Sequence, residues 1–203
     1  MSSMIFSREY VGYLARHTVK HLIDAKMIQT GKQAAVEERV YTGLLDELSL
    51  EDRINDEVRV ILDAYQEDMR RTGASYSEMF KKVKTELARK YKAVLNETSS
   101  QDRSRLPGSR PTLRISTDKL NKLGHVVADT LAETPQADFL EDRNTIRQES
   151  RKALEHLLLE EMRIDHAARQ KIESQRRIIP EGSQEWDILY RKYYNEEVKK
   201  LGI

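Results

Sequence analysis

Apolar side chains recur at intervals of three and four residues along most of this chain. One such run in the first half comprises Val11, Leu14, Ala15, Thr18 and Leu22. This spacing places side chains on one face of an α-helix. Further runs of the same kind start at Val36, Val58 and Tyr76. The pattern therefore predicts four amphipathic helices in the first half of the chain.

The second half of the chain repeats this pattern. Leu14 and Leu22 correspond to Leu123 and Leu131 at a spacing of 109 residues, and after a one-residue insertion the spacing becomes 110. In this second register, residues 76–82 align with residues 186–192. Self-similarity at a fixed spacing is the signature of an internal repeat. We therefore predict a tandem duplication, with residues 1–95 as the first repeat and residues 113–203 as the second.

Residues 96–112 separate the repeats and are rich in Ser, Arg and Pro, without helical periodicity. Such a composition is typical of a linker. The extended candidates, residues 4–6 and 113–115, are too short to build a sheet. The fold class predicted is all-α, with two tandem small helical bundles of about four helices each. We expect that fusion of two such modules turns a dimer of single modules into a pseudo-dimer of repeats within one, monomeric chain.

Small polar residues stand where the predicted helices begin. A side-chain oxygen at the N-cap accepts a hydrogen bond from an unpaired backbone N–H of the first turn. The expected N-caps of the first, third and last helices in the two repeats are Ser7 and Ser116, Asn55 and Asp165, and Ser75 and Ser183. Pro180 and Gly182 additionally predict a sharp turn before the last helix.

The charge balance excludes binding to phosphates through an overall excess of basic residues. The sequence has 35 Lys and Arg against 34 Asp and Glu, and neither repeat differs from neutrality by more than one charge. It has no cysteine, hence no disulfide or thiolate site, and no run of about 18 apolar residues that could span a membrane. Its first residues do not resemble a signal peptide. We expect a cytoplasmic protein with no membrane association.

The stretch from Ile179 to Glu197 carries a resemblance. Its Pro-Glu-Gly-Ser turn, Trp186 and the Tyr-Arg-Lys-Tyr-Tyr run of residues 190–194 are similar to the bacterial domain-of-unknown-function family numbered 507. The resemblance covers the second repeat end to end. The first repeat departs from it, because Tyr76 replaces the tryptophan and residues 83–84 replace the paired tyrosines. The resemblance implies a helical bacterial protein and brings no activity with it.

Catalytic and metal-binding patterns are weak in this sequence. His17 and His21 have a spacing that can ligate zinc, but the residues between them lack the glutamate of the metalloprotease motif, and neither has a histidine counterpart in the second repeat. Adjacent acids such as Glu160 and Glu161 point about 100° apart on a helix. No phosphate-binding glycine motif occurs. We expect no enzyme, no metal site and no cofactor.

The leading hypothesis is a non-enzymatic interaction or adaptor protein that presents its two related modules to a macromolecular partner, most simply another protein. Trp186, Leu189, Tyr190 and Tyr193 follow the apolar face of the last helix, whereas Tyr194 is expected to be exposed. The partner-binding residues predicted are Pro180, Glu181, Gly182, Ser183, Arg191 and Tyr194.

The alternative hypothesis is an RNA-binding or ribonucleoprotein-binding protein. Aromatic rings can stack on bases while nearby cations bind phosphates. The cations available are the arginines in and next to the linker and those of the last helix: Arg103, Arg105, Arg110, Arg114, Arg191, Lys192, Lys199 and Lys200. Acids four residues away partly neutralise the cations of the last helix, and the sequence leaves this alternative open.

Overall fold

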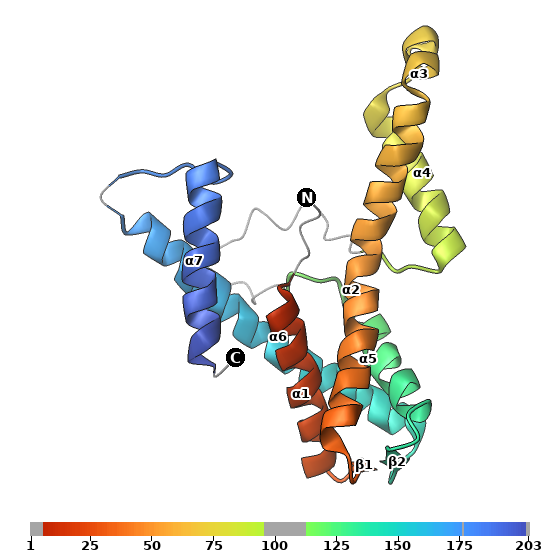
Figure 1. Cartoon of the computed structure of the whole chain (residues 1–203), viewed down its shortest axis with the longest axis vertical. Helices are drawn as coiled ribbons and strands as arrows, with labels where there is room; N and C mark the ends of the chain where they lie inside the picture. The colour runs from red at the N-terminus through yellow and green to blue at the C-terminus, as the bar shows by residue number, and fades with distance from the viewer. Residues whose placement is uncertain (1–5, 96–112, 176, 202–203) are drawn as a thin grey trace.

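The computed structural model describes residues 6–95, 113–175 and 177–201, and it confirms the all-α class (Figure 1). The linker, residues 96–112, lies outside the described residues. The elements of the first repeat are α1 (Arg8–Asp24), β1 (Ile28–Gln29), α2 (Gln33–Ala64), α3 (Gln66–Thr72) and α4 (Tyr76–Tyr91). Those of the second are α5 (Thr117–Ala132), β2 (Asp138–Phe139), α6 (Arg143–Glu173) and α7 (Gln184–Lys200).

The second and third helices expected in each repeat form one continuous helix. Within the described residues the first repeat still has four helices, because the short α3 precedes α4, whereas the second repeat has three. Helix α2 has 32 residues and α6 has 31. Asn55 and Asp165, which were expected as N-caps, lie inside these helices. No glycine or proline interrupts residues 44–62, and buried apolar residues at helical spacing lie on both sides of the expected break: Leu44 and Leu48 before it, and Ile54, Val58 and Leu62 after it. The division into two helices was therefore wrong.

The serine caps are largely as expected. The side chains of Ser7, Ser116 and Ser183 accept hydrogen bonds from backbone N–H groups of Tyr10, Lys119 and Trp186, respectively. Ser75 also stands at an N-cap position, but its side chain makes no cap hydrogen bond.

A short antiparallel pairing joins the two repeats where no strand was expected. Ile28 pairs with Phe139 and Gln29 with Asp138, while Leu140 N–H donates to Met27 O. In the 110-residue register Ile28 corresponds to Asp138 and Gln29 to Phe139, so the pairing is the one that a two-fold axis between the repeats would produce. The expected extended segment at residues 113–115 forms no strand.

The two repeats share one hydrophobic core. Helix α1 packs on α2 of its own repeat and on α6 of the other, and α5 likewise packs on α6 and α2. Buried residues from all four helices form one cluster, which includes Leu14 and Leu44 from the first repeat and Leu123 and Leu154 from the second. The two sequence repeats are thus built around a common core.

Two helical arms leave this shared base (Figure 1). In one arm α4 lies along the outer half of α2, with a small cluster of its own that contains Ile54, Val58 and Leu87. In the other arm α7 lies along α6, and its Tyr194 and Val198 belong to the main core. The second arm is therefore joined to the base more closely than the first.

Candidate functional site

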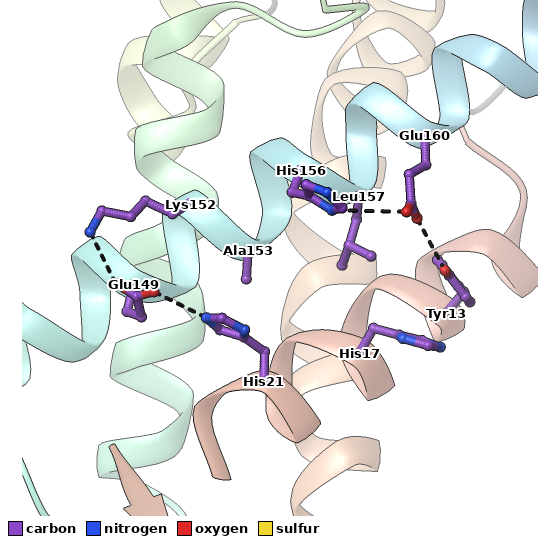
Figure 2. Close-up of a pocket in the computed structure, with 9 residues that line it drawn as sticks. All are labelled: Tyr13, His17, His21, Glu149, Lys152, Ala153, His156, Leu157 and Glu160. Atoms are coloured by element: carbon purple, nitrogen blue, oxygen red, sulfur yellow. Dashed lines mark hydrogen bonds and ion pairs between the residues drawn. The ribbon is translucent and has the colours of Figure 1, made fainter. Parts of the chain in front are cut away.

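A groove of about 460 Å³ lies between α1 of the first repeat and α6 of the second. We call it the α1–α6 groove. Positions 13, 17 and 21 of α1 face α6 because they are four residues apart on one helix (Figure 2). The residues that line the groove are Tyr13, His17, His21, Glu149, Lys152, Ala153, His156, Leu157 and Glu160.

The floor of the groove is apolar. Tyr13, Ala153 and Leu157 are all buried, with at most 8% of each residue exposed. In Figure 2 the side chains of Ala153 and Leu157 point from α6 toward α1, between His21 at one end and Tyr13 at the other. The short side chain of Ala153 fills little of the space between the helices. The floor can therefore contact an apolar group that enters the groove.

At one end of the groove, His21 and Lys152 hold Glu149. His21 Nε2 lies 3.0 Å from Glu149 Oε1, and Lys152 Nζ donates to Glu149 Oε2 at 3.1 Å. The hydrogen bonds from His21 and Lys152 lower the pKa of Glu149 below its ordinary value. This carboxylate is thus ionised at neutral pH and is held in place by groups from both repeats.

At the other end, Glu160 accepts a hydrogen bond from the first repeat. Tyr13 donates its hydroxyl to Glu160 Oε2 at 3.2 Å, and His156 Nδ1 lies 3.9 Å from Glu160 Oε1. Burial raises the pKa of Tyr13, and the negative charge of Glu160 raises it further. Tyr13 therefore stays protonated and acts as a hydrogen-bond donor.

His17 differs from the other two histidines of the groove. Its ring stacks at a tilt on that of Tyr13, with 4.0 Å between the centroids. Burial lowers its pKa, and the charges of Arg16 and Lys20 lower it further. A neutral imidazole can both donate and accept a hydrogen bond. His17 therefore offers an uncharged polar group at the rim of the groove.

The three histidines do not form a metal centre in the part of the chain that the structure describes. No group of three or more His, Cys, Asp or Glu side chains there could hold a metal ion. The sequence identified His17 and His21 as one helical face, and this is how they lie. His156 comes from a different repeat and its counterpart in the other repeat is Asp46, so no sequence signal indicated that it joins them.

The equivalent contact between α5 and α2 is closed instead of open. Val126 and Thr130 take the positions of His17 and His21, and Gly43 takes that of Ala153. A Cβ added at Gly43 would lie 2.7 Å from Thr130 Oγ1 and 3.2 Å from a methyl group of Val126. The missing side chain thus lets α5 pack directly on the α2 backbone, where α1 and α6 leave a groove.

The residues predicted to bind a partner are not brought together as one surface. Gly182 has φ +85°, as its place in a tight turn requires, and Ser183 caps α7. Pro180 and Glu181 are exposed, and Glu181 accepts a hydrogen bond from Arg169 Nη1. Arg191 is exposed farther along α7. The turn was predicted correctly, but its groups are used at least in part to fasten α7 to α6.

The expectation that Tyr194 is exposed was wrong. Only 7% of Tyr194 is exposed, and its hydroxyl donates to Glu161 Oε1 at 2.9 Å. The inner face of α7 passes through Tyr190, Tyr194 and Val198, which are four residues apart, and Tyr193 packs partly buried against the same core. The predicted face was therefore correct for Tyr190 and Tyr193 and omitted Tyr194. Tyr194 is therefore a core residue.

Several groups assigned to the RNA-binding alternative make internal contacts, and others are exposed. Trp186 and Tyr190 stack on each other with 4.9 Å between centroids, and the Arg169 guanidinium lies over both rings. Arg114 donates to Glu161 Oε1 at 2.8 Å. Arg103, Arg105 and Arg110 lie outside the described residues. The exposed cations of α7 are Arg191, Lys192, Lys199 and Lys200.

Two further observations concern the whole chain. Over the described ranges, no helix combines the length and the apolar character needed to cross a membrane. The model of a family described as "Protein of unknown function (DUF507)" matches residues 4–104 and again residues 112–203. These two matches confirm the tandem duplication and the resemblance. A search of curated proteins found no significant match.

Proposed function

The chain belongs to the DUF507 family through both of its repeats, and we propose that it is a non-catalytic interaction protein whose α1–α6 groove holds a segment of a protein partner. The main support for this proposal is that α1 and α6 leave a groove, whereas the equivalent helices α5 and α2 pack closely at Gly43. A difference of this kind points to a site, because packing alone would close both contacts, as it closes the contact at Gly43.

The chemistry of the groove favours a protein segment as the occupant. Sites that bind other molecules combine an apolar floor with a few placed polar groups. Here Ala153 and Leu157 supply the floor, and the imidazole of His17 supplies a polar group able to bind a peptide backbone. A segment that inserts one apolar side chain between the helices and hydrogen-bonds at the rim fits this arrangement.

The charges of the groove disfavour nucleic acid at this position. Glu149 and Glu160 stand at its two ends, roughly 16 Å apart along α6 by the rise of an α-helix. Phosphates bind where cations are in excess. Lys152 is the one permanently charged cation among the residues that line the groove. A protein partner is therefore the better fit.

The same groups support a binding role in preference to catalysis. Each carboxylate of the groove already has a partner, namely His21 for Glu149 and Tyr13 for Glu160. The two stand too far apart to act on one substrate atom. The absence of cysteine from the sequence is consistent with a cytoplasmic setting for this role, and the family resemblance implies a bacterial one.

The proposal is tested with a substitution that fills the groove. Full-length Ala153→Phe places a ring over the floor, and full-length Gln170→Phe adds the same ring at an exposed position of α6 away from the groove. Each protein is used to capture partners from cells that express the protein natively, and binding of each purified candidate is then measured directly. We expect Gln170→Phe to bind as the unmodified chain does and Ala153→Phe to lose the partner.

A second variant guards against misfolding of the first. The His156 side chain is 75% exposed, so His156→Glu changes the charge of the rim with little effect on the core. We expect it to weaken the same binding while the thermal unfolding midpoint falls only slightly, because the new carboxylate lies one helical turn from Glu160. Equal binding by all variants would overturn the proposal, as would a captured nucleic acid that is released by salt and unaffected by either substitution.

A further inference from the structure

The two repeats contact each other through different groups at equivalent positions. Lys119 of α5 donates from Nζ to Glu47 O at 2.9 Å and to Glu47 Oε1 at 2.6 Å. Its counterpart in α1 is Tyr10, whose hydroxyl donates to Leu157 O at 2.7 Å. Leu157 is in turn the counterpart of Glu47. One contact is thus a buried ion pair and the other a neutral hydrogen bond.

Both members of the ion pair are removed from water. Lys119 is 1% exposed and Glu47 is 8% exposed. A buried charge that loses its partner is strongly destabilising, whereas a neutral contact of similar shape is tolerated. The two repeats can therefore bury these surfaces against each other only when Lys119 and Glu47 face one another.

A pair of identical repeats would bury a charged side chain without its partner. Two second repeats would bring Lys119 against Leu157, which has no carboxylate, and the nearby Glu161 already accepts hydrogen bonds from Arg114 and Tyr194 of its own repeat. Two first repeats would bring Tyr10 against Glu47, which leaves a buried carboxylate with no cation. The observed pairing of a first with a second repeat places each ionised group against its opposite charge.

A steric clash also disfavours pairing of two second repeats, independently of the charges. Thr130 of α5 packs where Gly43 lacks a side chain, and a Cβ there would lie 2.7 Å from Thr130 Oγ1. In a pair of second repeats, Ala153 would take the place of Gly43 and supply that Cβ. Heavy atoms this close must move apart.

We infer that the face each repeat buries accepts the complementary repeat and rejects a copy of itself, so that the partner fitting this surface is the other repeat, supplied by the same chain or by a second copy of it. The Lys119–Glu47 pair sets this preference on one side of the pseudo-two-fold axis, and Gly43 opposite Thr130 reinforces it. The inference concerns the surface between the repeats and stands apart from the proposed function.

Two full-length variants with opposite charge reversals test this inference. Lys119→Glu places an acid against Glu47, and Glu47→Lys places a base against Lys119, so neither chain can satisfy its own pair. In an exchanged dimer of the two variants, the first repeat of one chain meets the second repeat of the other. Both pairs are then complementary. The double variant restores a complementary pair within one chain and serves as the control.

The proteins are unfolded and refolded separately and as an equimolar mixture, and their mass and thermal midpoint are measured. We expect each single variant to be less stable than the unmodified chain and the mixture to form a dimer more stable than either component. The double variant should be monomeric and more stable than either single variant, but less stable than the unmodified chain, because a glutamate at position 119 cannot donate to the carbonyl of residue 47. A mixture no larger or more stable than its components would overturn the inference. A double variant as unstable as the singles, or a stable dimer of one single variant alone, would do so too.

Discussion

The contact of α1 with α6 and the contact of α5 with α2 use equivalent helices in equivalent registers, but their chemistry has diverged. On the first side Tyr10 makes a neutral hydrogen bond and a groove remains open. On the second side Lys119 makes a buried ion pair and Gly43 allows close packing. In a dimer of identical modules both sides would change together. Duplication within one chain lets one side specialise in holding the repeats together while the other keeps an open surface.

The arms show the same divergence. On α7 the rings of Trp186, Tyr190 and Tyr194 form a continuous row, and Tyr190 and Tyr194 donate hydrogen bonds to Asp165 and Glu161 of α6. This row ties the arm of the second repeat to the core.

The corresponding positions of α4 are Tyr76, Phe80 and Lys84. Lys84 Nζ donates to Glu51 Oε1, the counterpart of Glu161, at 2.7 Å. Phe80 has no hydroxyl, and within the described ranges Asn55 Oδ1, the counterpart of an Asp165 oxygen, is buried without a hydrogen-bond partner. The arm of the first repeat therefore has weaker contacts, in agreement with its separate small cluster.

The largest expected effect comes from breaking the ion pair on the closed side. Lys119→Met leaves Glu47 buried without a cation, and we expect it to lower the free energy of unfolding by about 3–5 kcal/mol. Urea denaturation of the full-length chain measures this loss. The double variant Lys119→Met/Glu47→Leu should recover most of it, because no buried charge remains.

On the open side, Tyr10→Phe serves as the matched control and should cost only about 1 kcal/mol, since it removes one neutral hydrogen bond. Equal losses for Tyr10→Phe and Lys119→Met would show that the two sides do not differ in the way their contacts suggest.

An intermediate effect is expected from Gly43→Ala. In an open helix this change would stabilise by about 1 kcal/mol, but here the new Cβ meets Thr130 and Val126. Crowding of this kind costs about 1–3 kcal/mol, so we expect a net loss of up to about 2 kcal/mol in urea denaturation. Adding Thr130→Ala should relieve it. A gain in stability from Gly43→Ala alone would mean that α5 does not pack closely on α2.

The smallest effect concerns the pH dependence of stability. Burial raises the pKa of Glu161 above its ordinary value of 4.5, even though Arg114 and Tyr194 act in the opposite direction. Between the ordinary and the raised pKa the folded chain binds more protons than the unfolded chain, so stability falls as pH rises through this window. Glu161→Gln should remove this decline.

The lowered pKa of Glu149 acts with the opposite sign. Its contribution is present above the ordinary pKa and is lost as pH falls through the lowered one. Glu149→Gln should therefore flatten the acid side of the profile and leave the Glu161 window unchanged. Thermal unfolding midpoints from pH 3 to pH 8 would measure both windows, and identical profiles for the two variants would contradict the assignment.

The sequence was sufficient to predict the class, the duplication and three of the serine caps, because each depends on local spacing or on comparison of the repeats. It failed where residues from different repeats meet. Tyr194 was misplaced because the row from Trp186 to Tyr194 packs on an acid of α6 that sequence spacing does not reveal. His156 joins His17 and His21 only because the repeats pack together. Helix α2 is continuous because no glycine or proline interrupts it, although its buried residues change from the main core to the small cluster between Leu48 and Ile54, where the sequence suggested a break.

The open groove as a partner-binding site is tested most directly by photo-crosslinking at two equivalent positions. A photoreactive residue replaces either His156, at the rim of the groove, or its counterpart Asp46, which is also exposed. Both full-length proteins are irradiated in cells that express the protein natively. We expect a protein adduct from position 156 that is absent from position 46 and disappears when Ala153→Phe is added. Identical adducts from both positions, or an adduct from position 46 alone, would contradict the assignment of the groove.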